Sequence, residues 1–114
     1  MTRRLAWVLS VAAILLGLGH LSIGALSFQQ LSFGALWFTG SGIAIVMGGM
    51  LNLFALLASY GRGGLAVLGL ANLVLAGFFA LALTLLPGPQ VIAGLAIFVG
   101  LAALGRVSQP PRTA

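Results

Sequence analysis

Few side chains in this sequence can take part in chemistry, and His20 is the most conspicuous of them. It is the single histidine of the chain, and it lies inside an apolar run that extends from Leu5 to Leu26. An ionisable group within such a run is by default a candidate functional residue. Three roles are compatible with it: a neutral imidazole hydrogen-bonded to a neighbouring helix, a group that handles a proton or substrate, and a ligand of haem or a metal.

The depth of His20 in its run indicates which neighbours it can reach. It should lie level with Thr39 and Ser41 of the next apolar run, so a hydrogen bond to one of their hydroxyls is the ordinary expectation. No carboxylate is present to compensate a charged imidazole,. One histidine supplies a single strong ligand, so we predict no bound metal or cofactor. Haem held by His20 across a dimer is the alternative.

Two asparagines, Asn52 and Asn72, lie in the middle apolar runs. They could line a polar path, but pairing of two helices explains them better, because small residues continue from each at intervals of four. If the chain folds back at Arg62, Asn52 meets Asn72. The same fold predicts a seam of small residues, in which Gly48 meets Ala76, Ala44 meets Ala80, and Gly40 meets Thr84.

The residue types that most enzymes need for acid, base or nucleophilic catalysis are missing. The chain has no Asp, Glu or Cys. A serine beside His20 would lack the third group that usually orients such a pair. We therefore predict a protein that is not an enzyme.

Hydrophobic residues make up 61% of the 114 positions, and only 4% are charged. A soluble domain carries roughly 25% charged residues, whereas a membrane crossing needs about 20 apolar residues in a row. The sequence predicts an all-α integral membrane protein, a four-transmembrane-helix bundle that forms one domain over residues 1–107. The expected helices cover about 5–26, 33–58, 65–86 and 91–105, and residues 108–114 are expected to form a disordered cytoplasmic tail.

All charged side chains are arginines, and they fix the expected orientation. Arg3 and Arg4 precede the first run, Arg62 lies between the second and third, and Arg106 follows the fourth. The positive-inside rule then places both termini in the cytoplasm. These arginines are suited to lipid headgroups of the bilayer, not to nucleic acid, because they do not share one face. The use of Arg without Lys, with abundant Ala, Gly and Leu, points to a bacterial cytoplasmic (inner) membrane.

An internal repeat is suggested at an offset of 60 positions. Gln30, Gly34, Phe38 and Gly40 match Gln90, Gly94, Phe98 and Gly100. Further matches involve mainly Leu, Ala and Gly, which agree often by chance in such a chain. The pattern is either two tandem, parallel helical hairpins or coincidence.

The function predicted from these features is that of a non-catalytic accessory, structural or interaction subunit. Small-residue faces at Ala13/Gly17 and Ala96/Gly100 could contact a second copy or a larger membrane-protein partner. A small oligomeric transporter of a neutral or anionic solute is the main alternative. Length and helix count resemble those of the small multidrug resistance proteins, but that family depends on a membrane-embedded Glu that this chain lacks.

Overall fold

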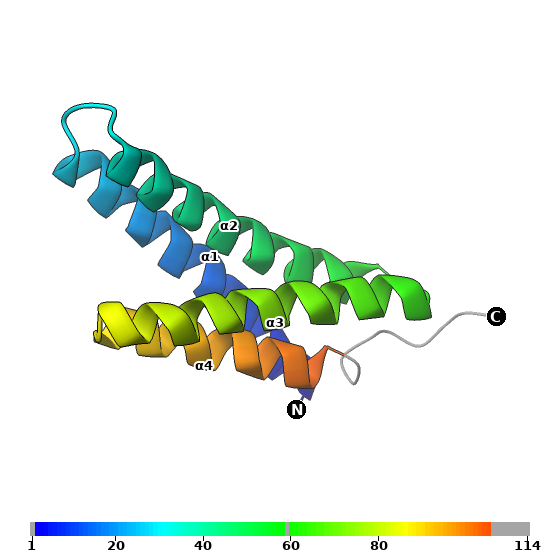
Figure 1. The fold of residues 1–114 in the computed structure, drawn as a ribbon. Coiled ribbons are helices and arrows are strands. Elements are labelled where there is room, and N and C mark those ends of the chain that lie inside the picture. The colour runs from blue at the N-terminus through cyan, green and yellow to red at the C-terminus, as the bar shows by residue number, and fades with distance from the viewer. Residues whose placement is uncertain (1, 59, 106–114) are drawn as a thin grey trace.

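A computed structural model describes residues 2–58 and 60–105, and the helices form four segments within them (Figure 1). The helices begin and end within a few residues of the predicted bounds. Arg106 and the predicted tail at 108–114 lie outside the described residues. The segments are α1 (Thr2–Ser27), α2 (Phe33–Leu57), α3 (Arg62–Leu85) and α4 (Pro89–Leu104).

Local sequence explains where the helices begin. Ser32 has an extended backbone and accepts a hydrogen bond of 3.1 Å from the Ala35 amide, which satisfies one of the free N–H groups at the start of α2,. α4 begins with Pro89, whose missing N–H costs nothing at a first helical position,. Gly88 precedes it in an extended conformation, so the turn between α3 and α4 is short.

Three of the described helices, α1, α2 and α3, are long and apolar enough to cross a membrane. α4 has 16 residues, which corresponds to about 24 Å of helix, against the ~30 Å of a typical hydrocarbon core,. A fourth crossing by α4 therefore stays a prediction that requires local thinning of the bilayer.

The four helices form two hairpins, α1–α2 and α3–α4, and each helix packs most extensively on its partner within the hairpin. Glycines bring the α1 and α2 backbones together. A methyl group built on Gly49 would lie 2.8 Å from the carbonyl oxygen of Ser10, and one on Gly17 would lie 2.8 Å from the backbone nitrogen of Val46. Only residues without a side chain permit this approach.

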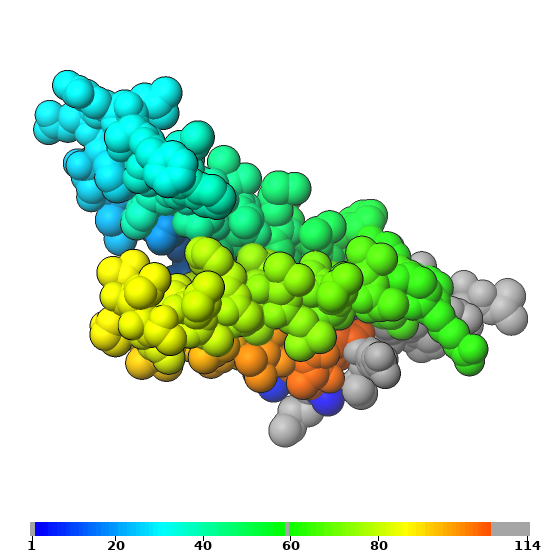
Figure 2. Space-filling view, in the orientation of Figure 1, coloured from blue at the N-terminus to red at the C-terminus, as the bar shows by residue number. Residues whose placement is uncertain are grey.

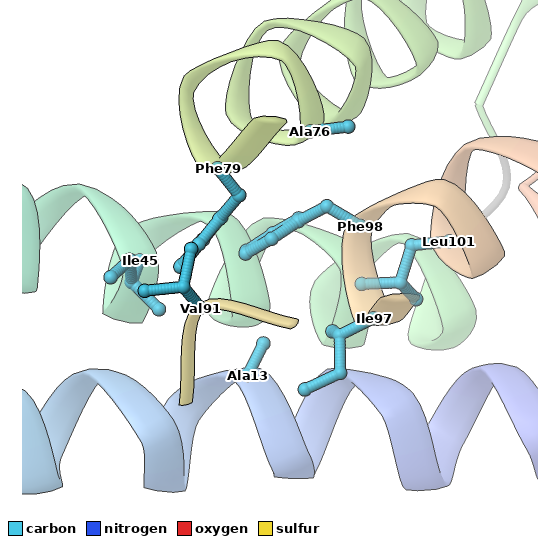
Figure 3. Packing of buried hydrophobic residues seen from close by; sticks show 8 residues of the cluster. All are labelled: Ala13, Ile45, Ala76, Phe79, Val91, Ile97, Phe98 and Leu101. Atoms are coloured by element: carbon cyan, nitrogen blue, oxygen red, sulfur yellow. The ribbon is translucent and has the colours of Figure 1, made fainter. Parts of the chain in front are cut away.

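The hairpins contact each other through a cluster of apolar side chains (Figure 3). Phe98 of α4 is fully buried there and stacks on Phe79 of α3, with ring centroids 5.9 Å apart. Aromatic pairs at this distance add to packing. The other buried members of the cluster are Ala13, Ile45, Ala76, Val91, Ile97 and Leu101.

The hairpins do not run side by side along their whole length. We call the end with Thr2, Leu57 and Arg62 the arginine end, and the end with the α1–α2 and α3–α4 turns the loop end. The hairpins meet at the arginine end and in the middle, and they separate towards the loop end (Figure 1). The space-filling view shows a notch between the two turns, which we call the wedge (Figure 2).

Candidate functional site

The two asparagine side chains lie at the arginine-end side of the core, where α2 meets α3. Asn52 Nδ2 donates to Asn72 Oδ1 at 2.7 Å, and Asn72 Nδ2 donates to Asn52 Oδ1 at 2.9 Å. The second hydrogen of Asn52 Nδ2 is donated to the Gly48 carbonyl at 2.8 Å. Both residues are buried. The buried amides thus satisfy each other, which is the arrangement expected of a helix-pairing contact.

The remainder of the expected α2–α3 seam is not formed. Gly48 and Ala76 are buried, but their neighbours Gly40, Ala44, Ala80 and Thr84 are exposed. Contacts between α2 and α3 are few, and a methyl group on Gly48 would instead meet Leu75 and Phe98. The physical reason is the splay of the hairpins: α2 and α3 are close near the asparagines and diverge towards the loop end.

The closest seam is the one between α1 and α2, and it was not predicted from sequence. Ala13 and Gly17, expected to face a partner, are buried within the chain. The seam could have been found from spacing. Its α1 members recur at intervals of three, four or seven, as they do in closely packed helices, and they are Ala6, Ser10, Ala13, Gly17 and Gly24.

His20 lies on α1 where the first hairpin extends beyond the core. Its ring stacks on Phe38, with centroids 3.8 Å apart and planes inclined by 13°. Its Nε2 is 3.1 Å from the Phe38 carbonyl oxygen and 3.0 Å from Ser41 Oγ. Ser41 Oγ also donates to the Phe38 carbonyl at 2.7 Å. His20 and Ser41 are therefore brought together, whereas Thr39 is exposed and lies outside this group.

These contacts assign the proton of the imidazole. A carbonyl oxygen can only accept, so the 3.1 Å contact to Phe38 requires a hydrogen on Nε2,. The Ser41 hydroxyl is donated to the same carbonyl, which leaves Ser41 Oγ as an acceptor for Nε2–H. The neutral ring then carries its lone pair on Nδ1.

Nδ1 of His20 has no hydrogen-bond partner among residues 2–58 and 60–105. No buried side-chain nitrogen or oxygen of the described residues is left without a partner, so Nδ1 reaches the surface. A methyl group on Gly42 would lie 3.2 Å from Cδ2 of His20. Cδ2 and Nδ1 are on opposite edges of the ring, so Nδ1 faces away from the α1–α2 seam.

Helix periodicity shows that His20 and Ser41 look towards the second hairpin. On α1, His20 follows Ala13 and Leu16 of the core contact by seven and four residues,. On α2, Ser41 precedes Ile45, another core residue, by four. Both residues thus belong to the face that packs on α3–α4, at the level where the second hairpin has moved away. The helix faces that carry them are therefore turned towards the wedge.

Arginines occupy the other end of the molecule. Arg3 Nη2 donates to the Leu56 carbonyl at 2.8 Å, so it ties the start of α1 to the last turn of α2. A cation is favourable beside the free carbonyls of a helix C-terminus. Arg3 was predicted to contact lipid headgroups, and its hydrogen bond to α2 was not predicted from sequence. Arg4 and Arg62 are exposed and remain suited to headgroups.

Metal binding by this chain alone finds no support in the described part. No group of three His, Cys, Asp or Glu side chains is found among its residues. His20 could contribute one ligand at most, and any further ligands would come from another molecule. No protein-family model matches the chain, and no curated protein or solved structure shows significant similarity to it.

Proposed function

We propose that this chain is a non-catalytic subunit of a membrane assembly and that it binds a transmembrane helix of its partner along α3. The support is a stripe of mostly small residues on α3 that the described part of the chain leaves uncovered. Methyl groups built on Gly69 and Gly77 would find no atom within 4 Å. The stripe consists of Ala66, Gly69, Leu73, Gly77, Ala80 and Thr84.

Energetics favour a role in packing for these uncovered glycines. A glycine inside a helix costs about 1 kcal/mol relative to alanine. In lipid, that cost is offset where the missing side chain lets a second helix approach closely. In the first hairpin Gly17 and Gly49 are covered in this way by α2 and α1. Gly69 and Gly77 could permit the same close approach to a helix of another molecule.

The proposed setting is the cytoplasmic membrane of a bacterium, with both termini on the cytoplasmic side. Three long apolar helices support membrane insertion. Arg3, Arg4 and Arg62 at one end support the orientation,. The absence of Asp, Glu and Cys from the sequence supports a role other than catalysis.

Purification in a mild detergent tests this proposal. We expect the tagged full-length chain to carry a stoichiometric membrane-protein partner, and Gly77→Leu to lose it because the new side chain holds the partner helix away. Gly19→Leu is the matched control, since Gly19 is equally open but lies on α1. Loss of the partner in both variants, or in neither, contradicts docking on α3. Self-cross-linking of Gly77→Cys would identify the partner as a second copy.

Passage of a neutral or anionic solute is a second candidate function, and the wedge is the observation that favours it. The wedge is open at the loop end, whereas the hydrogen-bonded Asn52–Asn72 pair joins the two hairpins towards the arginine end. Solute flux into proteoliposomes that contain the purified chain would support this function. If the liposomes stay as tight as protein-free ones, the subunit role is favoured.

A further inference from the structure

We propose that the wedge is a binding site for an uncharged amphiphile, a lipid whose small headgroup carries a hydroxyl donor, and that this hydroxyl bonds to Nδ1 of His20. The site lies on the inner faces of the hairpins. It is therefore separate from the outward stripe of α3 and does not depend on the proposed partner.

The wall of the wedge that carries His20 offers hydrogen-bond acceptors. Nε2–H of His20 and the hydroxyl hydrogen of Ser41 are both used within the chain, and the Phe38 carbonyl accepts both contacts. What the wall still offers is acceptors, chiefly the Nδ1 lone pair. The complementary ligand group is a donor such as a hydroxyl. The ring is held in place by its stack on Phe38, so the acceptor is oriented in advance.

The surroundings of His20 carry no charge in the described part of the chain. The described charged side chains are Arg3, Arg4 and Arg62, all at the arginine end, away from the wedge. Among the described residues a charged headgroup would find no opposite charge at His20, and an unpaired charge in apolar surroundings is costly. The ligand headgroup is therefore neutral.

The opposite wall of the wedge is apolar. Leu83 follows Ala76 of the core by seven residues and so lies on the inner face of α3, and Leu86 is the first residue after the helix,. Leu83 packs on the core, and Leu86 is exposed. A solute that is polar all round would leave these leucines facing its polar groups. A lipid can place its hydroxyl at His20 and its chains along the leucines.

Photolabelling tests the site with the full-length chain in phosphatidylcholine nanodiscs. The probe is a photoactivatable diacylglycerol, and the matched probe has its free hydroxyl methylated. We expect labels near Leu83–Leu86 and Phe38–Ser41, and about three- to ten-fold less labelling by the methyl ether, which is the effect of one hydrogen bond. Equal labelling by both probes, or labels spread evenly over the helices, overturns the proposal.

Variants separate the role of His20 from that of the fold. His20→Phe keeps a ring beside Phe38 and removes the acceptor, so it should reduce labelling as much as methylation does. Ser22→Ala is the control, because Ser22 is exposed and bonds only to the Leu18 carbonyl of its own helix. Full labelling of His20→Phe overturns the proposal. Competition by free glycerol would instead identify a water-soluble ligand and overturn the assignment to a lipid.

Nitrogen NMR of the unmodified chain gives a readout that needs no variant. In nanodiscs without diacylglycerol, we expect the proton on Nε2 and a bare Nδ1. Added diacylglycerol should shift the Nδ1 resonance and leave Nε2 nearly unchanged. A proton on Nδ1 in the ligand-free protein, or an Nδ1 resonance that does not respond, overturns the proposal even if His20→Phe fails to fold.

Discussion

Asn52 and Asn72 hold each other by two reciprocal hydrogen bonds of 2.7 and 2.9 Å, in which each amide is both donor and acceptor. The pair joins the two hairpins at one level. Because α2 and α3 diverge beyond it, the pair marks the level from which the distance between these two helices grows towards the loop end.

Cysteine cross-linking should reproduce this divergence. The sequence has no native Cys, so any disulfide within the chain must join the two introduced cysteines. We expect Asn52→Cys with Asn72→Cys to cross-link in membranes, and Gly40→Cys with Thr84→Cys to remain reduced. Efficient cross-linking of the second pair would show that α2 and α3 stay together along their length and that the wedge is closed.

Removal of one amide should cost more than removal of both. Asn52→Leu leaves the Asn72 amide buried without its partner, which we expect to reduce the free energy of unfolding by about 1–3 kcal/mol. The double variant with Asn72→Leu should lose clearly less than the sum of the two single variants. Reversible unfolding in mixed micelles, measured for the unmodified chain, the two single variants and the double variant, gives the coupling free energy between the two side chains. Additive losses would mean that the two amides act independently.

Gly49 should tolerate no side chain. The methyl group of Gly49→Ala would lie 2.8 Å from the Ser10 carbonyl oxygen and 2.9 Å from the Ile14 nitrogen, both backbone atoms that cannot rotate away. We expect a loss of about 1–3 kcal/mol in the free energy of unfolding. Gly19→Ala is the control. It meets no atom within 4 Å and should stabilise the helix by up to about 1 kcal/mol,.

Equal effects of the two glycine variants would contradict the close α1–α2 seam. A loss in Gly19→Ala alone would indicate that the outer face of α1 is covered by another molecule.

Topology can be tested with single cysteines and a membrane-impermeant maleimide. We expect Gln30→Cys and Gln90→Cys to react in intact cells, because both lie at the loop end. Gly61→Cys, beside Arg62, should react only after the membrane is opened. Reaction of Gln90→Cys from the opposite side to Gln30→Cys would show that α2 or α3 does not cross the bilayer.

The helices themselves could be predicted closely from sequence, since apolar runs and the turn residues Pro87–Pro89 mark them out. The Asn52–Asn72 contact could also be anticipated, because both residues lie at equal distances from the turn at Arg62. The faces along which the helices pack could not be predicted from sequence. Small residues occur on more than one face of α2, with Gly40 and Ala44 on one and Gly42 and Gly49 on another. Spacing along a single helix does not choose between them.

The choice between these faces depends on residues in other helices. Phe79 and Phe98 fill the space between the hairpins and leave α2 and α3 in contact over only a short region. The contacts of His20 could likewise be predicted only in part from sequence. Its depth indicated Ser41, but the Phe38 carbonyl, which assigns the imidazole proton, is a backbone group that every residue possesses.

The splay of the hairpins also gives the molecule unequal cross-sections at its two ends. In a bilayer, the protein together with the lipid held in its wedge would occupy more area in the leaflet at the loop end than in the leaflet at the arginine end. A flat membrane must stretch one leaflet or compress the other around such a shape, whereas a bent membrane already has leaflets of different area. The chain is therefore expected to gather where the membrane curves towards the arginine end.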